Sequence, residues 1–160
     1  MASKQILTPE TVWTPSEMTE ERIQALVDCG LLRPKAEMEW KAPAGEPFPS
    51  EDDKEQVVFA AFFERGFNIP TDDFFCRLLH YYYLELVHLV PNSIMVVSSF
   101  IHLYEPYLGI PPHFNLWRYF FQVKKNGKVK VIGSIGFILR LGLKAQYVDM
   151  ELPDSISRWK

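Results

Sequence analysis

The sequence is poor in cysteine and has no surplus of positive charge. Its 160 residues include only two cysteines, Cys29 and Cys76, and the N-terminal segment has no apolar run of the kind that directs secretion. Reduced thiols and a location in the cytoplasm or nucleus are therefore expected. The net charge of −3 disfavours nucleic-acid binding by the chain as a whole, because proteins that bind nucleic acid concentrate Lys and Arg.

Long apolar segments are also absent. No run of about 18 apolar residues is free of polar interruption, so we expect neither a membrane-spanning segment nor a membrane partner. The sequence shows no internal repeat and no low-complexity tract. These absences leave a globular domain as the expected class.

Signatures of catalysis are missing as well. No serine stands in a G-x-S-x-G elbow, and the glycines of "GSIG" (133–136) lack the Lys-Ser/Thr of a phosphate-binding loop. The pairs Glu85–His88 and His102–Glu105 have the i, i+3 spacing of one helix face, but the further carboxylates of a bridged metal site are not beside them. We therefore expect no catalytic residue, no metal and no cofactor.

Apolar and aromatic residues, by contrast, are abundant. The chain is 48% hydrophobic and 14% aromatic, which suits a domain with a core of its own. Residues 1–55 are expected to form an N-terminal leader with one short helix and a Pro-rich acidic connector, and residues 56–160 the main domain. The leader helix is predicted to begin at Ser16 or Thr19, as its cap, and to stop at Gly30.

The main domain begins with a strongly apolar run. The segment from Val57 to Glu64 suits either a buried strand or a helix. Asp72 and Asp73 then predict the start of a helix, because negative charge is favourable at a helix N-terminus. Apolar residues recur at 3- and 4-residue spacing as far as Leu89, which predicts one long helix to that point.

Two more helices are predicted after it. One begins after Pro91, with Asn92 or Ser93 as its cap, and Pro106 is expected to end or kink it. Its side chains are apolar almost all round, which is typical of a buried helix. The segment "HFNLWRYFFQV" (113–123) predicts the other.

The C-terminal part of the sequence is typical of strands. Asn126-Gly127 stands between alternating segments and predicts a tight β-hairpin turn. The expected fold class is therefore α+β, with a helical core and a C-terminal antiparallel β-hairpin or small sheet. The lysines around this turn either contact nucleic acid or keep a strand edge soluble; they are Lys124, Lys125, Lys128 and Lys130.

The order of several motifs is more specific than any one of them. "FFERGFNIP", "HLVPNSI", "FIHLYEPYLGIPPHFNLWR", "GSIGFILR" and "DSISRW" follow one another in the order of a plant domain family, the gypsy-type transposases. The chain resembles this family from about Val57 to Trp159. The matched motif positions that we take as candidate site residues are Glu64, Gly66, His88, Asn92, Glu105, His113, Trp117 and Arg118.

The resemblance implies a scaffold derived from a retroelement reading frame. Among the motif positions only Glu64 and Glu105 are acids, too few for Mg²⁺-dependent DNA cleavage. Because the family commonly continues beyond the tryptophan whereas this sequence stops at Lys160, the resemblance also implies a shortened copy retained by the host. The expected function is a non-enzymatic module that binds another protein.

Alternatives to this function stay open. A nucleic-acid-associated element protein, capsid-like or accessory to a transposase, is the first alternative. A small metal- or His-dependent enzyme is the least favoured. Association with a second copy of the chain is also left open.

The polar motif residues are given a structural role. Glu105 and Arg118 are expected to form a buried or half-buried ion pair between two helices. His88 and His113 are expected to hydrogen-bond loop carbonyls beside that pair. These groups are thus predicted to hold the core together.

Overall fold

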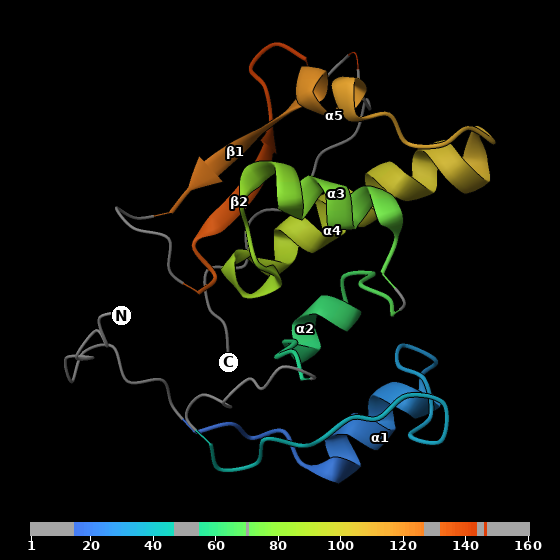
Figure 1. Cartoon of the computed structure of the whole chain (residues 1–160), viewed down its shortest axis with the longest axis vertical. Coiled ribbons are helices and arrows are strands. Elements are labelled where there is room, and N and C mark those ends of the chain that lie inside the picture. Colours follow the sequence, from blue (N-terminus) through green and yellow to red (C-terminus); the bar gives the residue numbers. More distant parts are fainter. Residues whose placement is uncertain (1–14, 47–54, 70, 127–131, 144–145, 147–160) are drawn as a thin grey trace. The chain divides into compact units, whose positions relative to one another are not determined.

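The computed structural model describes residues 15–46, 55–69, 71–126, 132–143 and 146 (Figure 1). The chain divides into two compact units, Met1–Val57 and Val58–Lys160. In the part that is described, no helix has the length and apolar character needed to cross a membrane.

The described part of the first unit contains one helix, α1 (Glu20–Asp28). Of the two predicted caps, Thr19 is the one that caps it, since its side-chain oxygen accepts a hydrogen bond from the Arg22 amide. After Gly30, whose φ of 71° reverses the chain, the connector runs back towards the start of the unit. The amide of Ser16 donates to the Glu46 carbonyl at 2.8 Å, so the two ends of the described segment are joined.

The second unit contains most of the regular structure. The apolar run after Val57 forms a helix and not a strand. The helical elements are α2 (Ala60–Phe63), α3 (Asp73–Tyr82), the 3-10 turn η2 (Leu86–His88), α4 (Pro91–His102), the π-helix η3 (Leu103–Tyr107) and α5 (Phe114–Phe120).

Helix α3 is shorter than its apolar pattern predicts. Asp72 caps it by accepting from the amide of Phe74 at 2.7 Å, but the helix ends at Tyr82 and does not reach Leu89. Tyr83 takes the left-handed conformation (φ 52°, ψ 49°), which cannot continue a helix. Leu84, Leu86 and Leu89 are still buried, so burial continues beyond the helix and the pattern overestimates its length.

Helix α4 begins two or three residues earlier than predicted. Its N-cap is Val90 and Pro91 is its first residue, so the prediction that Asn92 or Ser93 caps it is wrong. Proline fits this position because its missing N–H would have no partner in the helix. At the other end, Pro106 lies inside η3, and the chain turns at Gly109, which has a φ of 67°.

The sheet has two antiparallel strands, β1 (Phe121–Lys125) and β2 (Ile135–Leu139). The α+β class is therefore confirmed. Lys125 lies opposite Ile135, and the Asn126 amide donates to the Ser134 carbonyl at 2.7 Å. The predicted antiparallel pairing therefore extends to Asn126, whereas Gly127, the second residue of the predicted turn, lies outside the described residues.

The core of the second unit is aromatic. Trp117 of α5 is fully buried, and its ring lies 4.3 Å from the Phe121 ring, 5.2 Å from those of Phe100 and Phe137, and 6.0 Å from that of Phe74. These rings come from α3, α4, β1 and β2, so one indole contacts four other elements of the unit. The core therefore fixes the strands against the helices, and with them the surfaces around α5.

Candidate functional site

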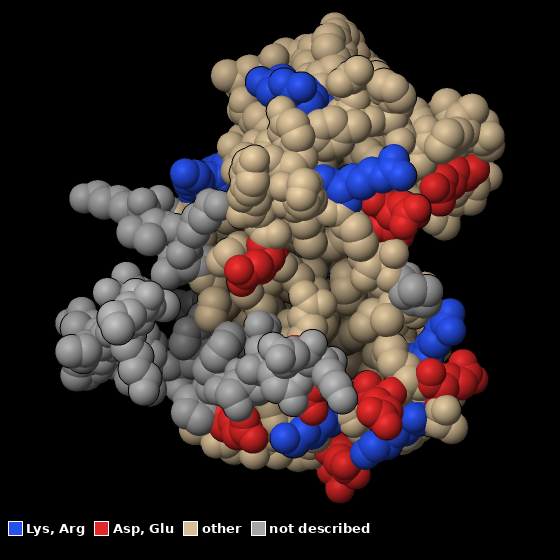
Figure 2. Space-filling model, viewed as in Figure 1, with Lys and Arg blue, Asp and Glu red and all other residues tan. Residues whose placement is uncertain are grey.

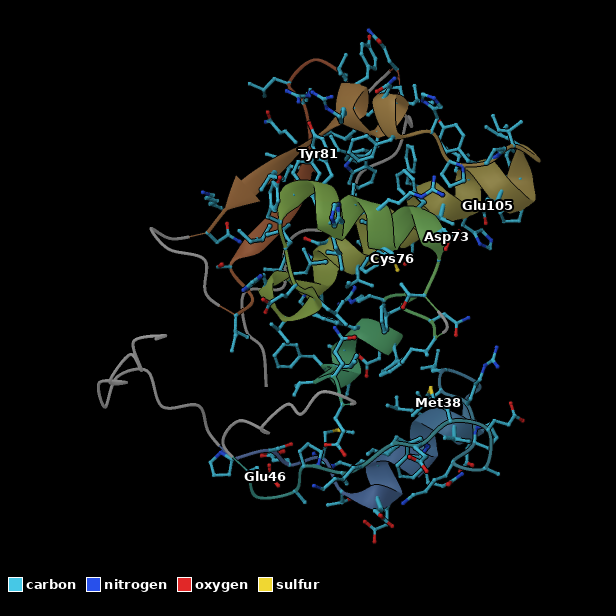
Figure 3. The ribbon with its side chains drawn as sticks, in the orientation of Figure 1. Met38, Glu46, Asp73, Cys76, Tyr81 and Glu105 are labelled. Atoms are coloured by element: carbon cyan, nitrogen blue, oxygen red, sulfur yellow. The ribbon has the colours of Figure 1, made fainter. Side chains whose placement is uncertain are left out.

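The expected ion pair between Glu105 and Arg118 does not form, and both side chains are exposed. The Arg118 guanidinium lies over the Tyr81 ring, 5.3 Å from its centre. Figure 3 shows Glu105 near the end of η3, well apart from Tyr81. The π-helix carries Glu105 past the packed part of α4, and this is why it cannot reach α5.

The two histidines are not core residues either. His88 is half-buried, and its Nδ1 accepts from the Glu85 amide at 3.0 Å, so the expected bond to a loop carbonyl is wrong. The same two residues cap η2 reciprocally. His113 is exposed at the start of α5, where its side chain makes no capping hydrogen bond. The hypothesis that charged and imidazole groups hold the core together is therefore wrong.

The buried polar residues that the structure describes are two serines and not the charged or imidazole side chains that the sequence analysis expected. In the part of the chain that is described, Ser93 and Ser134 are the buried polar residues. The Ser93 hydroxyl donates to the Ile135 carbonyl and accepts from the Phe137 amide, each at 3.1 Å. Sequence reasoning considered Ser93 only as a cap. A serine in the first turn of an otherwise apolar, buried helix could have indicated a buried hydrogen bond at this position.

The remaining motif residues are mainly structural. Gly66 has a φ of 88°, and its carbonyl accepts from the Ser98 hydroxyl at 2.9 Å. Trp117 lies at the centre of the core. Glu64 is exposed at the end of α2, and Asn92 is half-buried at the start of α4.

The candidate nucleic-acid contacts lie at the end of β1. Lys124 and Lys125 are exposed, whereas Lys128 and Lys130 lie outside the described residues. The ranges of the chain that are described contain no group of three or more His, Cys, Asp or Glu side chains arranged to hold a metal ion.

One exposed apolar surface begins at the last residue of η3 and continues beyond it. We define the apolar projection as Tyr107, Leu108 and Ile110, whose exposed fractions are 80%, 49% and 50%. In Figure 1 this part of the chain extends from α4 (yellow) away from the two strands (orange). Over α3, α4 and α5 the face in Figure 2 is mostly uncharged, with the charged residues in a few separate groups.

The backbone of the apolar projection is fixed. The Leu108 amide donates to the Leu103 carbonyl at 3.1 Å, the i to i−5 bond of a π-helix, and the Ile110 amide donates to the Tyr104 carbonyl at 3.0 Å. Tyr104 is itself buried, with its ring 4.6 Å from that of Phe100. The exposed side chains are therefore attached to a segment that the core holds in place.

A second surface combines arginine and tyrosine. We define the arginine–tyrosine face as Tyr81 and Tyr82 of α3, Arg118 of α5, and Arg140, which follows β2. The Arg140 Nε donates to the Arg118 carbonyl at 3.0 Å. Burial raises the pKa of Tyr82, whereas the indole N–H of Trp117 and the two nearby guanidinium groups lower it by smaller amounts.

The second unit is thus a small α+β domain with an aromatic core and two exposed surfaces. Residues 57–125, from the segment before α2 through β1, match the family model described as "Putative gypsy type transposon". The resemblance is therefore confirmed over this segment, and the chain carries a gypsy-type transposon-related domain. Searches of curated proteins and of solved structures give no significant match.

Proposed function

We propose that this domain is a non-enzymatic protein-binding module of plant origin, retained by its host as an intracellular regulator in the cytoplasm or nucleus. The observation that supports it is the apolar projection. Three neighbouring apolar side chains are exposed there, including a tyrosine with an exposed fraction of 80%. Tyrosine is enriched in protein interfaces, and contiguous exposed apolar patches mark interaction sites more often than single residues do.

The fixed backbone of the projection also favours binding. Association costs free energy when loops and side chains must be ordered. Since Leu108 and Ile110 are held by hydrogen bonds to Leu103 and Tyr104, little backbone ordering is left for a partner to induce. This supports a preformed binding surface.

The test compares proteins captured from plant extract by the purified chain and by a triple variant, Tyr107→Ser, Leu108→Ser and Ile110→Ser. A matched control carries Leu31→Ser and Leu141→Ser, because these leucines are also exposed but lie elsewhere in the sequence. We expect the control to keep the captured partners and the triple variant to lose them by about tenfold or more. Circular dichroism verifies that both variants fold. Identical capture by the wild type and the triple variant would overturn the proposal.

Nucleic-acid binding is the second candidate, and the exposure of Lys124 and Lys125 favours it. Neither lysine forms an ion pair with a carboxylate in the described part of the chain. If they bind single-stranded nucleic acid, each phosphate contact contributes about 0.7 to the slope of log affinity against log salt. Lys124→Gln with Lys125→Gln removes both charges. The affinity for an oligo-dT probe should then depend less steeply on salt, with the magnitude of the slope reduced by about 1.4.

A further inference from the structure

The arginine–tyrosine face presents two guanidinium groups that have no carboxylate partner among the described residues. Both Arg118 and Arg140 are exposed, and neither takes part in an ion pair in the described ranges. Arg118 contacts the Tyr81 ring, and Arg140 uses Nε and Nη1 in bonds to the Arg118 carbonyl and the Gln122 side chain. A guanidinium has five N–H donors, so most of the donors of this pair are left for a ligand or for water.

The two groups are held next to each other by the fold. The Arg140 amide donates to the Phe120 carbonyl at 2.7 Å, and the Arg140 side chain donates to the carbonyl of Arg118. Both guanidinium groups also act electrostatically on the Tyr82 phenol. Arg118 and Arg140 are far apart in the sequence, and the antiparallel register of β1 and β2 brings them together.

The aromatic side of the face is rigid as well. The Tyr81 ring makes edge contacts with Phe114 at 4.6 Å and with Tyr82 at 5.0 Å, and the Arg118 guanidinium lies over it. A guanidinium stacked on a fixed ring loses less freedom when it binds a ligand. Arginine and tyrosine are also the residues most enriched in binding hot spots.

We propose that the arginine–tyrosine face binds an acidic segment of a partner protein, with the partner's carboxylates hydrogen-bonded to Arg118 and Arg140. This inference rests on the protein-binding function proposed above, and it adds a second contact surface and the chemistry of its partner. The planar fork of a guanidinium matches the two oxygens of a carboxylate, and such charge-assisted pairs are stronger than neutral hydrogen bonds. Two neighbouring guanidinium groups therefore select a segment with at least two carboxylates.

A protein partner fits this face better than single-stranded nucleic acid does. Bases bind by stacking on open aromatic faces. The Arg118 guanidinium lies over the Tyr81 ring, and the rings of Phe114 and Tyr82 contact it in T-shaped geometry, so less of this ring is open to a stacking base. Lys124 and Lys125 lie two and three residues beyond Gln122, the β1 residue whose side chain contacts Arg140, which is about 7–10 Å along the strand, so the test needs nucleic acid as a competing probe.

The test measures binding of a fluorescent oligoglutamate peptide to the full chain by anisotropy at about 0.15 M ionic strength, where charges beyond about 8 Å are largely screened. Arg118→Gln with Arg140→Gln should weaken binding by about tenfold or more. Lys124→Gln with Lys125→Gln removes the same charge and should change affinity by about twofold or less. Equal losses in the two double variants would overturn the proposal, because they would show a response to net charge alone. No detectable binding to the wild type would overturn it too.

Two further arms separate the alternatives. Arg118→Lys with Arg140→Lys keeps the charge but not the planar fork, and we expect it to remain weakened by about threefold or more. Oligo-dT is the competing probe, and tighter arginine-dependent binding of oligo-dT than of oligoglutamate would replace the protein partner with nucleic acid. The triple variant of the apolar projection should bind oligoglutamate like the wild type. Failure at one surface therefore does not imply failure at the other.

Discussion

At the scale of single residues, Ser93 connects α4 to the sheet. Its hydroxyl bonds to two backbone groups of β2, the Ile135 carbonyl and the Phe137 amide. The Ile135 carbonyl also accepts from the Val90 amide, so it would keep a partner without Ser93. The Phe137 amide would lose the hydrogen bond that Ser93 accepts from it.

Ser93→Ala is therefore expected to lower the free energy of unfolding by about 1–3 kcal/mol, because a buried N–H is left without an acceptor. The measurement is urea denaturation followed by circular dichroism. Ser99→Ala is the matched control, since Ser99 lies on the same helix and is exposed, and it should change stability by about 0.5 kcal/mol or less. Equal effects of the two substitutions would contradict the bridging role.

Gly66 is the second residue with a specific structural role. An added Cβ would strain its left-handed backbone and would meet the Ser98 Cβ at 3.0 Å. Gly66→Ala should cost about 1–2 kcal/mol for the backbone alone, and more for the contact. Gly109→Ala is the control, because Gly109 also has a positive φ but nothing lies within 4 Å of its added Cβ. If Gly109→Ala were the more destabilising of the two in urea denaturation, the contact with Ser98 would be unimportant.

The sequence located the important motif residues but not all of their roles. Two of the motif residues, Trp117 and Gly66, have structural roles, one in the core and one at a turn. The sequence analysis misplaced Glu105 and Arg118, because residue type alone does not tell whether a charged side chain next to aromatic residues points into the core or covers its edge. An arginine can lie on a ring while its charged end stays in water, as Arg118 does on Tyr81.

At the scale of elements, helix boundaries depend on a few backbone conformations. The leader helix, the start of α3 and the existence of α4, α5 and β1 follow from capping residues and apolar patterns. The end of α3 does not, because an apolar pattern records burial and continues past Tyr83 into η2. The register of the strands was also missed, since the pairing of Lys125 with Ile135 depends on the core and not on the local turn signal.

Two tyrosines on these helical elements give the fold a dependence on alkaline pH. Burial raises the pKa of Tyr82 in α3 and of Tyr104 in η3 above the ordinary value of 10.0. The folded chain therefore keeps these protons at pH values where the unfolded chain loses them. The free energy of unfolding should be unaffected by these two groups well below pH 10 and should fall as the pH rises through that value.

The check is urea denaturation of the wild type and of Tyr82→Phe at a series of alkaline pH values. The variant's stability should fall less steeply with pH, because one of the two shifted groups is gone. The difference in the free energy of unfolding between the two proteins at neutral pH measures the other effects of losing the hydroxyl. This difference is subtracted from the differences at alkaline pH. A steeper fall in the variant would show that the sign of the Tyr82 contribution is wrong.

At the scale of the whole molecule, the two units differ in their cores. The described part of Met1–Val57 buries two large apolar side chains, Ile23 and Leu32, whereas the second unit has the aromatic cluster around Trp117. Burial of a large apolar side chain contributes about 1.5–3 kcal/mol. The second unit therefore has the apolar burial that a stable domain of its size needs.

A chain of residues 58–160 is accordingly expected to fold on its own, with a cooperative thermal transition. A chain of residues 1–57 should show no such transition, because its described apolar core is too small. Near-ultraviolet circular dichroism during heating distinguishes the two, since fixed aromatic packing gives a signal that is lost on unfolding. A non-cooperative transition in residues 58–160 would mean that the aromatic cluster does not define an independent domain.

The α+β class and the family were both predictable from the sequence, because each depends on many residues and tolerates errors in a few. The two exposed surfaces were not predictable. The apolar projection depends on a π-helix that contains Pro106, and the arginine–tyrosine face depends on a strand register that joins distant residues. Surfaces of this kind depend on tertiary contacts, which local sequence patterns do not predict.

The bridge from Val90 and Ser93 to β2 has a consequence for aggregation. A strand edge with unpaired backbone groups recruits strands from other chains and can seed fibrils. At Ile135 and Phe137 those groups are already occupied by the start of α4, so another molecule cannot add a strand there unless α4 first detaches. The first turn of α4 thereby blocks strand addition on this side of the short sheet.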